Sequence, residues 1–455
     1  MDTGGPIPSE ESISARIERL PFSGWHVRMM AIAGTAHFSD SFDALAIAFV
    51  LPVLIGAWDI SQPEVGILIS AGYVGQMLGA IGFGWIAERI GRRGALQLSV
   101  IVIAALSLAC GLAWNYASLF VFRTLQGLGL GGEVPVAAAY MNEIAVTRFR
   151  GVIAILLQSA FAFGIVVTAL LSTWIVPHLG WQWMFFLGAV PIVLAVWLRQ
   201  LMPESPRWLA ARGRLEDADA VLAAVEHEIA GSGRKFNPWP TAFPALVRTE
   251  ASVASLFQGR YLVRTLLVGG VMLCTSFVGY SLLTWMPTIY RTVLKLPVEE
   301  TLRLGLIQSV ASFLGVLVAA ALVDVIGRRP TFMLGFFGSA AALGVLWHSD
   351  VHGSVAYVAA LASTGLFFIS TLLSGLYLYM AEIYPTRMRA LGTGLGSAWL
   401  RVGSIIGPSV VGLILGVGDL STVFLTFAVV ALVGGILILM FAVETRGRVL
   451  EEVAP

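Results

Sequence analysis

The sequence predicts an all-α membrane protein with twelve transmembrane helices in two six-helix, pseudo-symmetric halves. Three observations support this. Of the 455 residues, 57% are hydrophobic and only 12% are charged, whereas a soluble domain has about 25% charged residues. Twelve stretches are long and apolar enough to cross a bilayer, which takes about 20 residues. Charged motifs at the ends of these stretches occur twice along the chain.

The twelve expected spans are separated by mostly short connections. They cover residues 27–55, 65–87, 94–113, 117–140, 151–175, 182–201, 262–287, 304–325, 331–348, 354–380, 390–416 and 421–443. The long polar connection 202–261 divides them six and six. Its residues Leu215, Ala218, Leu222, Val225 and Ile229 recur at helical spacing. That spacing predicts either a surface helix lying against the membrane domain or a plain linker helix.

This division predicts five segments. The membrane halves are residues 27–201 and 262–443, joined by the central loop 202–261 and flanked by an N-terminal segment, 1–26, and a tail, 444–455. Loops on the cytoplasmic side of a membrane are enriched in Lys and Arg. Arginines follow spans 2, 4, 8 and 10, while the loops after spans 1, 3, 5, 9 and 11 contain neither Lys nor Arg. We therefore expect a multi-pass protein of the plasma (cell inner) membrane with both termini and the central loop in the cytoplasm.

The repeated motifs combine an acid, a glycine and arginines at matching span ends. The first half contains Glu88, Gly91, Arg92, Arg93, Glu143, Arg148 and Arg150, and the second half contains Asp324, Gly327, Arg328, Arg329, Glu382 and Arg387. A third pair, Glu204 and Glu444, follows the last span of each half. Glycine permits a tight turn between helices. We expect these charges to form a conformational latch at the cytoplasmic ends of the helices; the alternative is that the arginines only anchor the loops.

Through these motifs the chain resembles the major facilitator superfamily over essentially its full length. The two loops that end in Gly91-Arg92-Arg93 and Gly327-Arg328-Arg329 are the most specific signature, and Arg123-x-x-x-Gly127-x-Gly129 is another. The segments beginning at Pro203 and Glu444 are similar to the sugar-porter branch. Gly131-Gly132-Glu133 and the pair Asp40 and Asp43 are similar to the niacin-transporter and aromatic-acid:proton symporter group. The resemblance implies the major facilitator fold, with a central site between two halves and alternating access.

Ionisable residues inside the spans are candidates for proton coupling, because charge in hydrocarbon is costly and usually functional. Asp40 and Asp43 share one face of the first span, and Arg123 and Glu133 lie in the fourth. Burial favours the neutral form of a carboxyl, so such an acid can carry a proton. In related carriers the arginine of the fourth span takes part in this coupling. The alternative is a static ion pair between spans 1 and 4. His37, three residues before Asp40, either assists or is a packed, hydrogen-bonded group.

Arg401 is the main candidate for substrate binding. It lies near the centre of span 11, and a guanidinium there can bind a carboxylate through two hydrogen bonds. The rival interpretation is a structural salt bridge. Aromatic and amide groups could complete a pocket, and we select Gln158, Tyr280, Gln308 and Tyr377 from a wider set that includes Tyr73 and Gln76.

The sequence thus predicts a secondary active transporter that moves a small organic (aromatic or pyridine) carboxylate with protons by alternating access. The alternatives are a sugar or polyol proton symporter and a drug or metabolite exporter. No P-loop, nucleophile motif or metal-ligand spacing occurs, so we expect neither an enzyme nor a cofactor or metal, with the proton gradient as the driving force. The expected partners are a small-molecule substrate, protons and the lipid bilayer, without nucleic acid, and one chain should function as a monomer.

Overall fold

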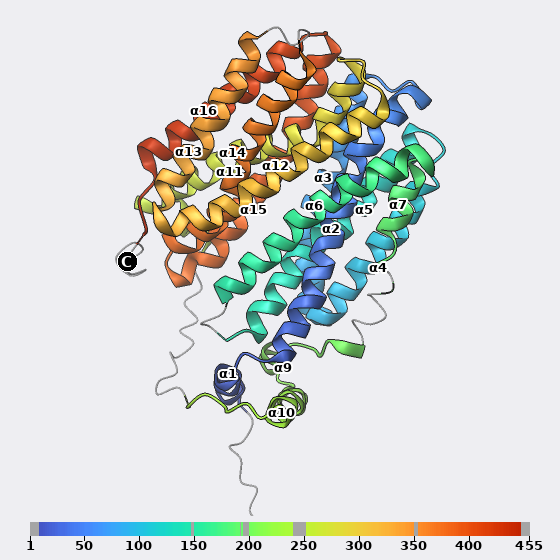
Figure 1. The fold of residues 1–455 in the computed structure, drawn as a ribbon. Coiled ribbons are helices and arrows are strands. Elements are labelled where there is room, and N and C mark those ends of the chain that lie inside the picture. The colour runs from blue at the N-terminus through green and yellow to red at the C-terminus, as the bar shows by residue number, and fades with distance from the viewer. Residues whose placement is uncertain are drawn as a thin grey trace, which may run out of the picture.

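The structure, a computed structural model, describes residues 9–146, 150–191, 193, 200–239, 252–349 and 354–446. The side chains of residues 150–152, 154, 155, 158, 374, 386, 387 and 390 are not among those described. In the described ranges every regular element is helical. The helices form two bundles that pack side by side (Figure 1).

Each bundle follows the spans expected from the sequence. The first contains α2 (Gly24–Trp58), α3 (Gln62–Ile90), α4 (Arg92–Gly111), α5 (Tyr116–Ile144), α6 (Arg150–His178) and α7 (Gln182–Gly188). The second contains α11 (Gly259–Thr292), α12 (Val298–Val325), α13 (Arg328–His348), α14 (Val355–Ile383), α15 (Thr386–Gly416) and α16 (Leu420–Phe441). Much of the sixth expected span, 182–201, lies outside the described residues. The prediction of an all-α protein with two bundles is confirmed.

Ten of the described helices are long and apolar enough to cross a membrane. α5 has the length of a span but is not among the ten, and it carries Arg123 and Glu133 in its interior. Prolines occur inside α2, α5, α11 and α15. Membrane helices tolerate such prolines because neighbouring groups satisfy the backbone atoms that they free.

Glycines let α3 and α5 cross closely. A Cβ atom added at Gly79 of α3 would lie 2.7 Å from the backbone of Leu128, and one at Gly131 of α5 would lie 2.6 Å from the Cα atom of Gln76. Small residues at a crossing allow two helix backbones to approach. The crossing brings Gln76 next to the helix that carries Arg123 and Glu133.

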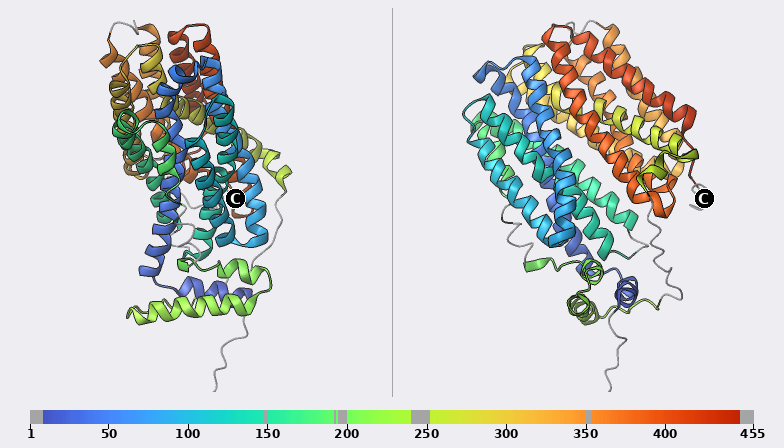
Figure 2. Two further views of the ribbon diagram at one scale, coloured as in Figure 1. Left: turned by 90° about the vertical axis from the view of Figure 1, so that its right-hand side faces the viewer. Right: turned by 180° about the vertical axis from the view of Figure 1, so that it is seen from behind.

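Three further helices lie together at one end of the first bundle (Figures 1 and 2). They are α1 (Glu10–Arg19), α9 (Pro206–Ala211) and α10 (Leu215–Gly231). α10 buries Ala218, Leu222, Val225 and Ile229, which belong to the apolar stripe read from the sequence. Arg16 of α1 pairs with Glu226 of α10 at 2.8 Å. α10 is therefore a packed surface helix that contacts α1, α9 and α2.

The two halves meet along α3 and α15, α2 and α11, and α6 and α12. The Ser70 hydroxyl donates to the carbonyl of Ile405 at 2.7 Å and lies 2.7 Å from the Ser409 hydroxyl. A Cβ atom at Gly66 would lie 3.3 Å from the Cα atom of Gly412. These contacts fall where α3 begins and α15 ends, so the halves are closed against each other at that end.

Candidate functional site

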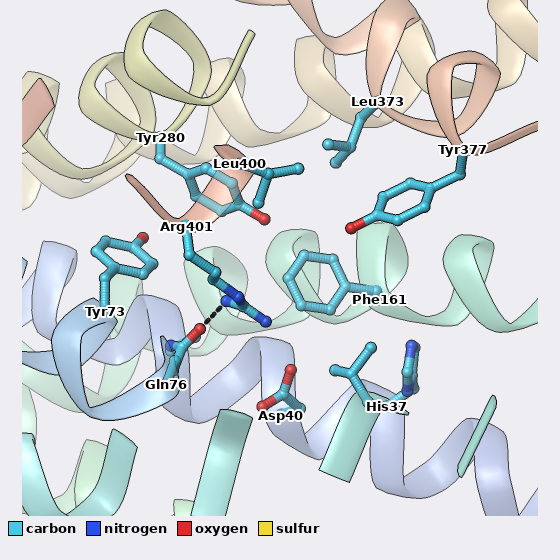
Figure 3. Close-up of a pocket in the computed structure, with 12 residues that line it drawn as sticks. His37, Asp40, Tyr73, Gln76, Phe161, Tyr280, Leu373, Tyr377, Leu400 and Arg401 are labelled. Atoms are coloured by element: carbon cyan, nitrogen blue, oxygen red, sulfur yellow. Dashed lines mark hydrogen bonds between the residues drawn. The ribbon is translucent and has the colours of Figure 1, made fainter. Parts of the chain in front are cut away.

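A cavity lies between the two halves (Figure 3). The first half contributes His37, Asp40, Ala44, Tyr73, Gln76, Val134 and Phe161, and the second contributes Tyr280, Leu373, Tyr377, Leu400 and Arg401. Its volume is about 40 Å³, well below the roughly 300–1,000 Å³ of a typical ligand pocket. The walls are therefore drawn close together around a small polar centre.

Asp40 and Arg401 face each other across this cavity from opposite halves (Figure 3). Asp40, on α2, is only 4% exposed, and its Oδ1 atom has no hydrogen-bond partner among the described residues. No described ion pair joins it to Arg401. A carboxyl and a guanidinium thus share a site without neutralising each other by direct contact.

Arg401 instead donates a hydrogen bond from Nη1 to the Oε1 atom of Gln76 on α3. Its partner is a neutral amide, and the sequence-based alternative of a structural salt bridge has no counterpart among the described contacts of this residue. A desolvated guanidinium is stabilised when an anion pairs with it. Arg401 is therefore positioned to bind an anionic ligand in the cavity.

His37 lies one helical turn before Asp40 and also lines the cavity. Its Nδ1 atom lies 3.2 Å from Oε2 of Glu133 on α5. Both side chains are almost fully buried, at 4% and 1% exposure. Glu133, expected from the sequence to handle protons, thus lies behind the cavity wall and contacts the cavity through His37.

Asp43 belongs to a separate buried network on the side of α2 that faces α4 and α5. Its Oδ1 atom accepts from Ser107 and, at 3.0 Å, from Gln126, while Oδ2 has no described partner. Arg123 donates to the backbone carbonyl of Asp43 at 2.9 Å and to Oε1 of Gln126 at 2.7 Å. Arg123 therefore contacts Asp43 through its backbone, and the structure separates this pair from the cavity that Asp40 lines.

The remaining predicted substrate residues differ in their placement. Tyr280 and Tyr377 line the cavity with Arg401. Gln308 is buried elsewhere and donates to the carbonyl of Leu282 at 3.3 Å, so its prediction as a lining residue is not met in this arrangement. The side chain of Gln158 lies outside the described residues. Phe161, which no sequence signal distinguished from other apolar residues, supplies part of the wall.

The repeated charged motifs form equivalent clusters in the two halves. Arg92, at the start of α4, pairs with Glu88 and with Glu143, each at 2.8 Å. Arg328, at the start of α13, pairs in the same way with Asp324 and Glu382, again at 2.8 Å. Each cluster joins three helices within its own half.

A glutamate that follows each half completes the cluster. Glu204 accepts from the backbone N–H groups of Arg92 at 2.9 Å and Arg93 at 3.2 Å, and Glu444 accepts from those of Arg328 at 3.0 Å and Arg329 at 2.9 Å. The capped helices begin after Gly91 and Gly327, whose φ angles are +94° and +102°. Glu204 and Glu444 were not among the predicted latch residues, although their spacing of 240 positions matches the repeat. Arg148 lies outside the described residues, as do the side chains of Arg150 and Arg387.

Burial raises the pKa of Glu444, but hydrogen bonds from the backbone N–H groups of Arg446, Arg328, Arg329 and Thr445 lower it, and the net pKa lies below its ordinary value of 4.5. The carboxylate is therefore ionised at neutral pH. A charged cap suits the helix N-terminus, where unpaired N–H groups and the helix dipole favour an anion.

Two helical bundles that enclose a central polar cavity are the architecture of a membrane transporter of the major facilitator type. A family model described as "Sugar (and other) transporter" matches residues 28–455, and the chain belongs to that family. It is a transporter and not an enzyme.

Relatives and solved structures agree with this family. The niacin transporter NiaP of Acinetobacter baylyi is 31% identical over 441 residues, which cover 96% of this chain and 99% of the relative. The 4-hydroxybenzoate transporter PcaK of Pseudomonas aeruginosa is 29% identical over 416 residues, or 91% of each chain. The xylose transporter XylE from E. coli, in a partially occluded inward open conformation, superposes with a TM-score of 0.74 at 18% identity, covering 94% of this chain and 100% of XylE. At that identity the structural likeness concerns the fold.

Proposed function

We propose that the protein is a proton-coupled symporter of a small organic carboxylate with an aromatic or pyridine ring. The observation that carries this proposal is Arg401, a half-buried guanidinium bonded to a neutral amide in a cavity between the halves. Tyr280, Tyr377 and Phe161 supply aromatic walls. The names of two relatives, a niacin transporter and a 4-hydroxybenzoate transporter, support the same substrate class.

Competition for Arg401 gives a physical basis for coupling. An ionised Asp40 and a substrate carboxylate would both be attracted to the same guanidinium. Protonation of Asp40 removes the competing charge, so the anion binds most tightly together with a proton. Once the substrate leaves, Asp40 can release its proton and interact with Arg401 again. Each cycle would carry an anion and a proton in the same direction.

The other titratable residues would support this exchange. Glu133 acts through His37, which it contacts at 3.2 Å. Asp43 and Arg123 hold α2, α4 and α5 together through Gln126 and Ser107. In this scheme the exchangeable proton is on Asp40, because that side chain lines the cavity.

Arginine placement supports an orientation in which the clusters of Arg92 and Arg328 lie on the cytoplasmic side of the plasma membrane, together with both termini. The contact of Ser70 with Ser409 is then at the outer end. The arrangement corresponds to an inward-facing or nearly occluded state, in which the two arginine clusters keep the helix ends of each half together. One chain contains both halves of the cavity, which supports function as a monomer.

Transport of a sugar or polyol is the second candidate, supported by the wording of the family model. Hydroxyl groups of a sugar could bond to Gln76, Tyr280 and Tyr377. The candidate leaves the charges of Asp40 and Arg401 without a direct role in substrate binding.

Uptake into proteoliposomes tests the proposal. Labelled nicotinate should accumulate when an inward proton gradient is imposed, and a protonophore should abolish the accumulation. Asp40→Asn should lose accumulation but retain exchange of internal for external substrate. Accumulation that survives the protonophore would refute the symport mechanism, and uptake of xylose but not of nicotinate or benzoate would favour the sugar candidate.

A further inference from the structure

The imidazole of His37 is the cavity-lining group to which the coupling scheme gives no direct contact with substrate. It borders the same cavity as Arg401, while its Nδ1 atom lies 3.2 Å and 3.4 Å from the two carboxylate oxygens of Glu133. A buried ionisable group inside a membrane helix usually has a function.

The contact with Glu133 determines which part of the imidazole can meet a ligand. An ionised carboxylate only accepts hydrogen bonds, so Nδ1 carries the hydrogen in this pair. A ligand contact by this ring therefore falls to Nε2. Nε2 accepts a hydrogen bond when the imidazole is neutral and donates one when it is doubly protonated.

Aromatic side chains extend along the cavity near His37. The ring of Phe161 lies edge-on to His37, with a centroid distance of 6.4 Å, and Tyr280 and Tyr377 line the part contributed by the second half. In the view of Figure 3, His37 lies on one side of Asp40 and Gln76 on the other, with the guanidinium of Arg401 above Asp40. Aromatic walls favour a planar ring in between, with polar groups at its edges.

We propose that His37 is a specificity-determining residue, which hydrogen-bonds through Nε2 to a polar ring position of an aromatic acid whose carboxylate binds Arg401. The polar position is a ring nitrogen or a ring hydroxyl. Glu133 is a positioning residue that fixes the orientation of the imidazole. The inference rests on the proposed function, since it requires that Arg401 binds the carboxylate.

The inference predicts selectivity among acids of similar size. Benzoate has the carboxylate and the ring but no polar ring position, so it leaves Nε2 without a ligand partner. A site built to hydrogen-bond a ligand discriminates against an analogue that lacks the group, because the buried polar atom stays unpaired. Affinity for a ring that carries the matching group should exceed affinity for benzoate by about tenfold.

Equilibrium binding to the purified full-length protein in nanodiscs tests this inference. Nicotinate, 4-hydroxybenzoate and benzoate are compared by competition against labelled benzoate. At least one polar-ring acid should bind about tenfold more tightly than benzoate, and the better of the two identifies a ring nitrogen or a hydroxyl as the matching group. His37→Phe, which keeps an aromatic ring but no hydrogen-bonding atom, should abolish the preference and leave benzoate affinity within about twofold.

Because His37→Phe leaves Glu133 buried without its partner, Glu133→Gln is the second variant. It should lower the ratio of polar-ring to benzoate affinity while benzoate binding persists, and the double variant should lose no more selectivity than His37→Phe alone. Equal affinities of the three acids for the unaltered protein, or equal losses for all three in both variants, would overturn the role of His37 while leaving the proposed function intact. If none of the three binds the unaltered protein, the proposed function fails and this inference fails with it.

Discussion

Arg401 of α15 donates a hydrogen bond to Gln76 of α3, and this bond joins the two halves at the central cavity. The same contact therefore concerns both ligand binding and the separation of the halves. A carboxylate that takes the place of the amide would exchange a neutral acceptor for a charged one, which makes a stronger hydrogen bond. Binding of the anion would in this way compensate for breaking a contact between the halves.

Replacement of Arg401 by Lys should weaken binding of an aromatic carboxylate by about tenfold to a hundredfold. Lysine keeps the positive charge but cannot form the paired, planar hydrogen bonds of a guanidinium. Equilibrium binding of labelled nicotinate measures the effect. Arg303→Lys is the matched control, because Arg303 is an exposed arginine on α12. Equal affinity of Arg401→Lys and the unaltered protein would exclude Arg401 as the carboxylate-binding residue.

Asp43→Asn should leave the number of protons carried per substrate unchanged, while Asp40→Asn should reduce it. An asparagine at position 43 retains an oxygen that can accept from Ser107 and Gln126, although the altered network should slow transport. The reversal potential of substrate flux in proteoliposomes measures the stoichiometry. If Asp43→Asn abolishes coupling and Asp40→Asn preserves it, the exchangeable proton is on Asp43.

Gly79→Ala should destabilise the protein by about 1–3 kcal/mol, since the new methyl group would meet the backbone of Leu128 at a tight helix crossing. Gly82→Ala, one turn further along α3, adds a methyl group where no atom lies within 4 Å. This control should be neutral or slightly stabilising, because alanine favours a helix over glycine by roughly 0.5–1 kcal/mol. Thermal unfolding in detergent compares the two. Similar melting temperatures for both variants would show that α3 and α5 can separate without cost.

Glu444→Gln should destabilise the second half by about 1 kcal/mol, because a neutral side chain interacts less favourably with the start of α13. The pKa of Glu444 is lower in the folded protein than its ordinary value of 4.5. Its ionised form therefore contributes stability above about pH 4.5, and this contribution is lost as the pH falls through the lower, folded-state pKa.

The difference in melting temperature between the unaltered protein and Glu444→Gln should consequently be constant from about pH 5.5 to 8. It should shrink only in more acidic solution. A difference that varies between pH 6 and 8 would mean that another group titrates at the cap.

Hydrophobicity and repetition made the fold accessible from the sequence. Eleven spans end within a few residues of their expected limits, because long apolar stretches are set by the thickness of the bilayer. The repeated acid, glycine and arginine motifs located equivalent helix ends such as those at Gly91 and Gly327. Glu204 and Glu444 carried the same repeat signal, but their role as caps depends on how a distant segment returns to the helix start.

The site was accessible only in part, because sequence spacing does not show which side of a membrane helix faces the cavity. Asp40 and Asp43 lie on the same helix face by spacing, yet Asp40 lines the cavity while Asp43 joins Ser107 and Gln126. Gln308 resembled the other buried amides and faces the carbonyl of Leu282 instead. These differences arise from the packing of helices that are far apart along the chain.

The two glutamate caps give the molecule an internal comparison that few proteins offer. Glu204 and Glu444 make the same backbone contacts at the start of α4 and α13, so the same substitution can be made once in each half of a single chain. The local chemistry lost is the same in both cases. A difference in transport rate between Glu204→Gln and Glu444→Gln would therefore measure how unequally the two halves share the motion of the transport cycle.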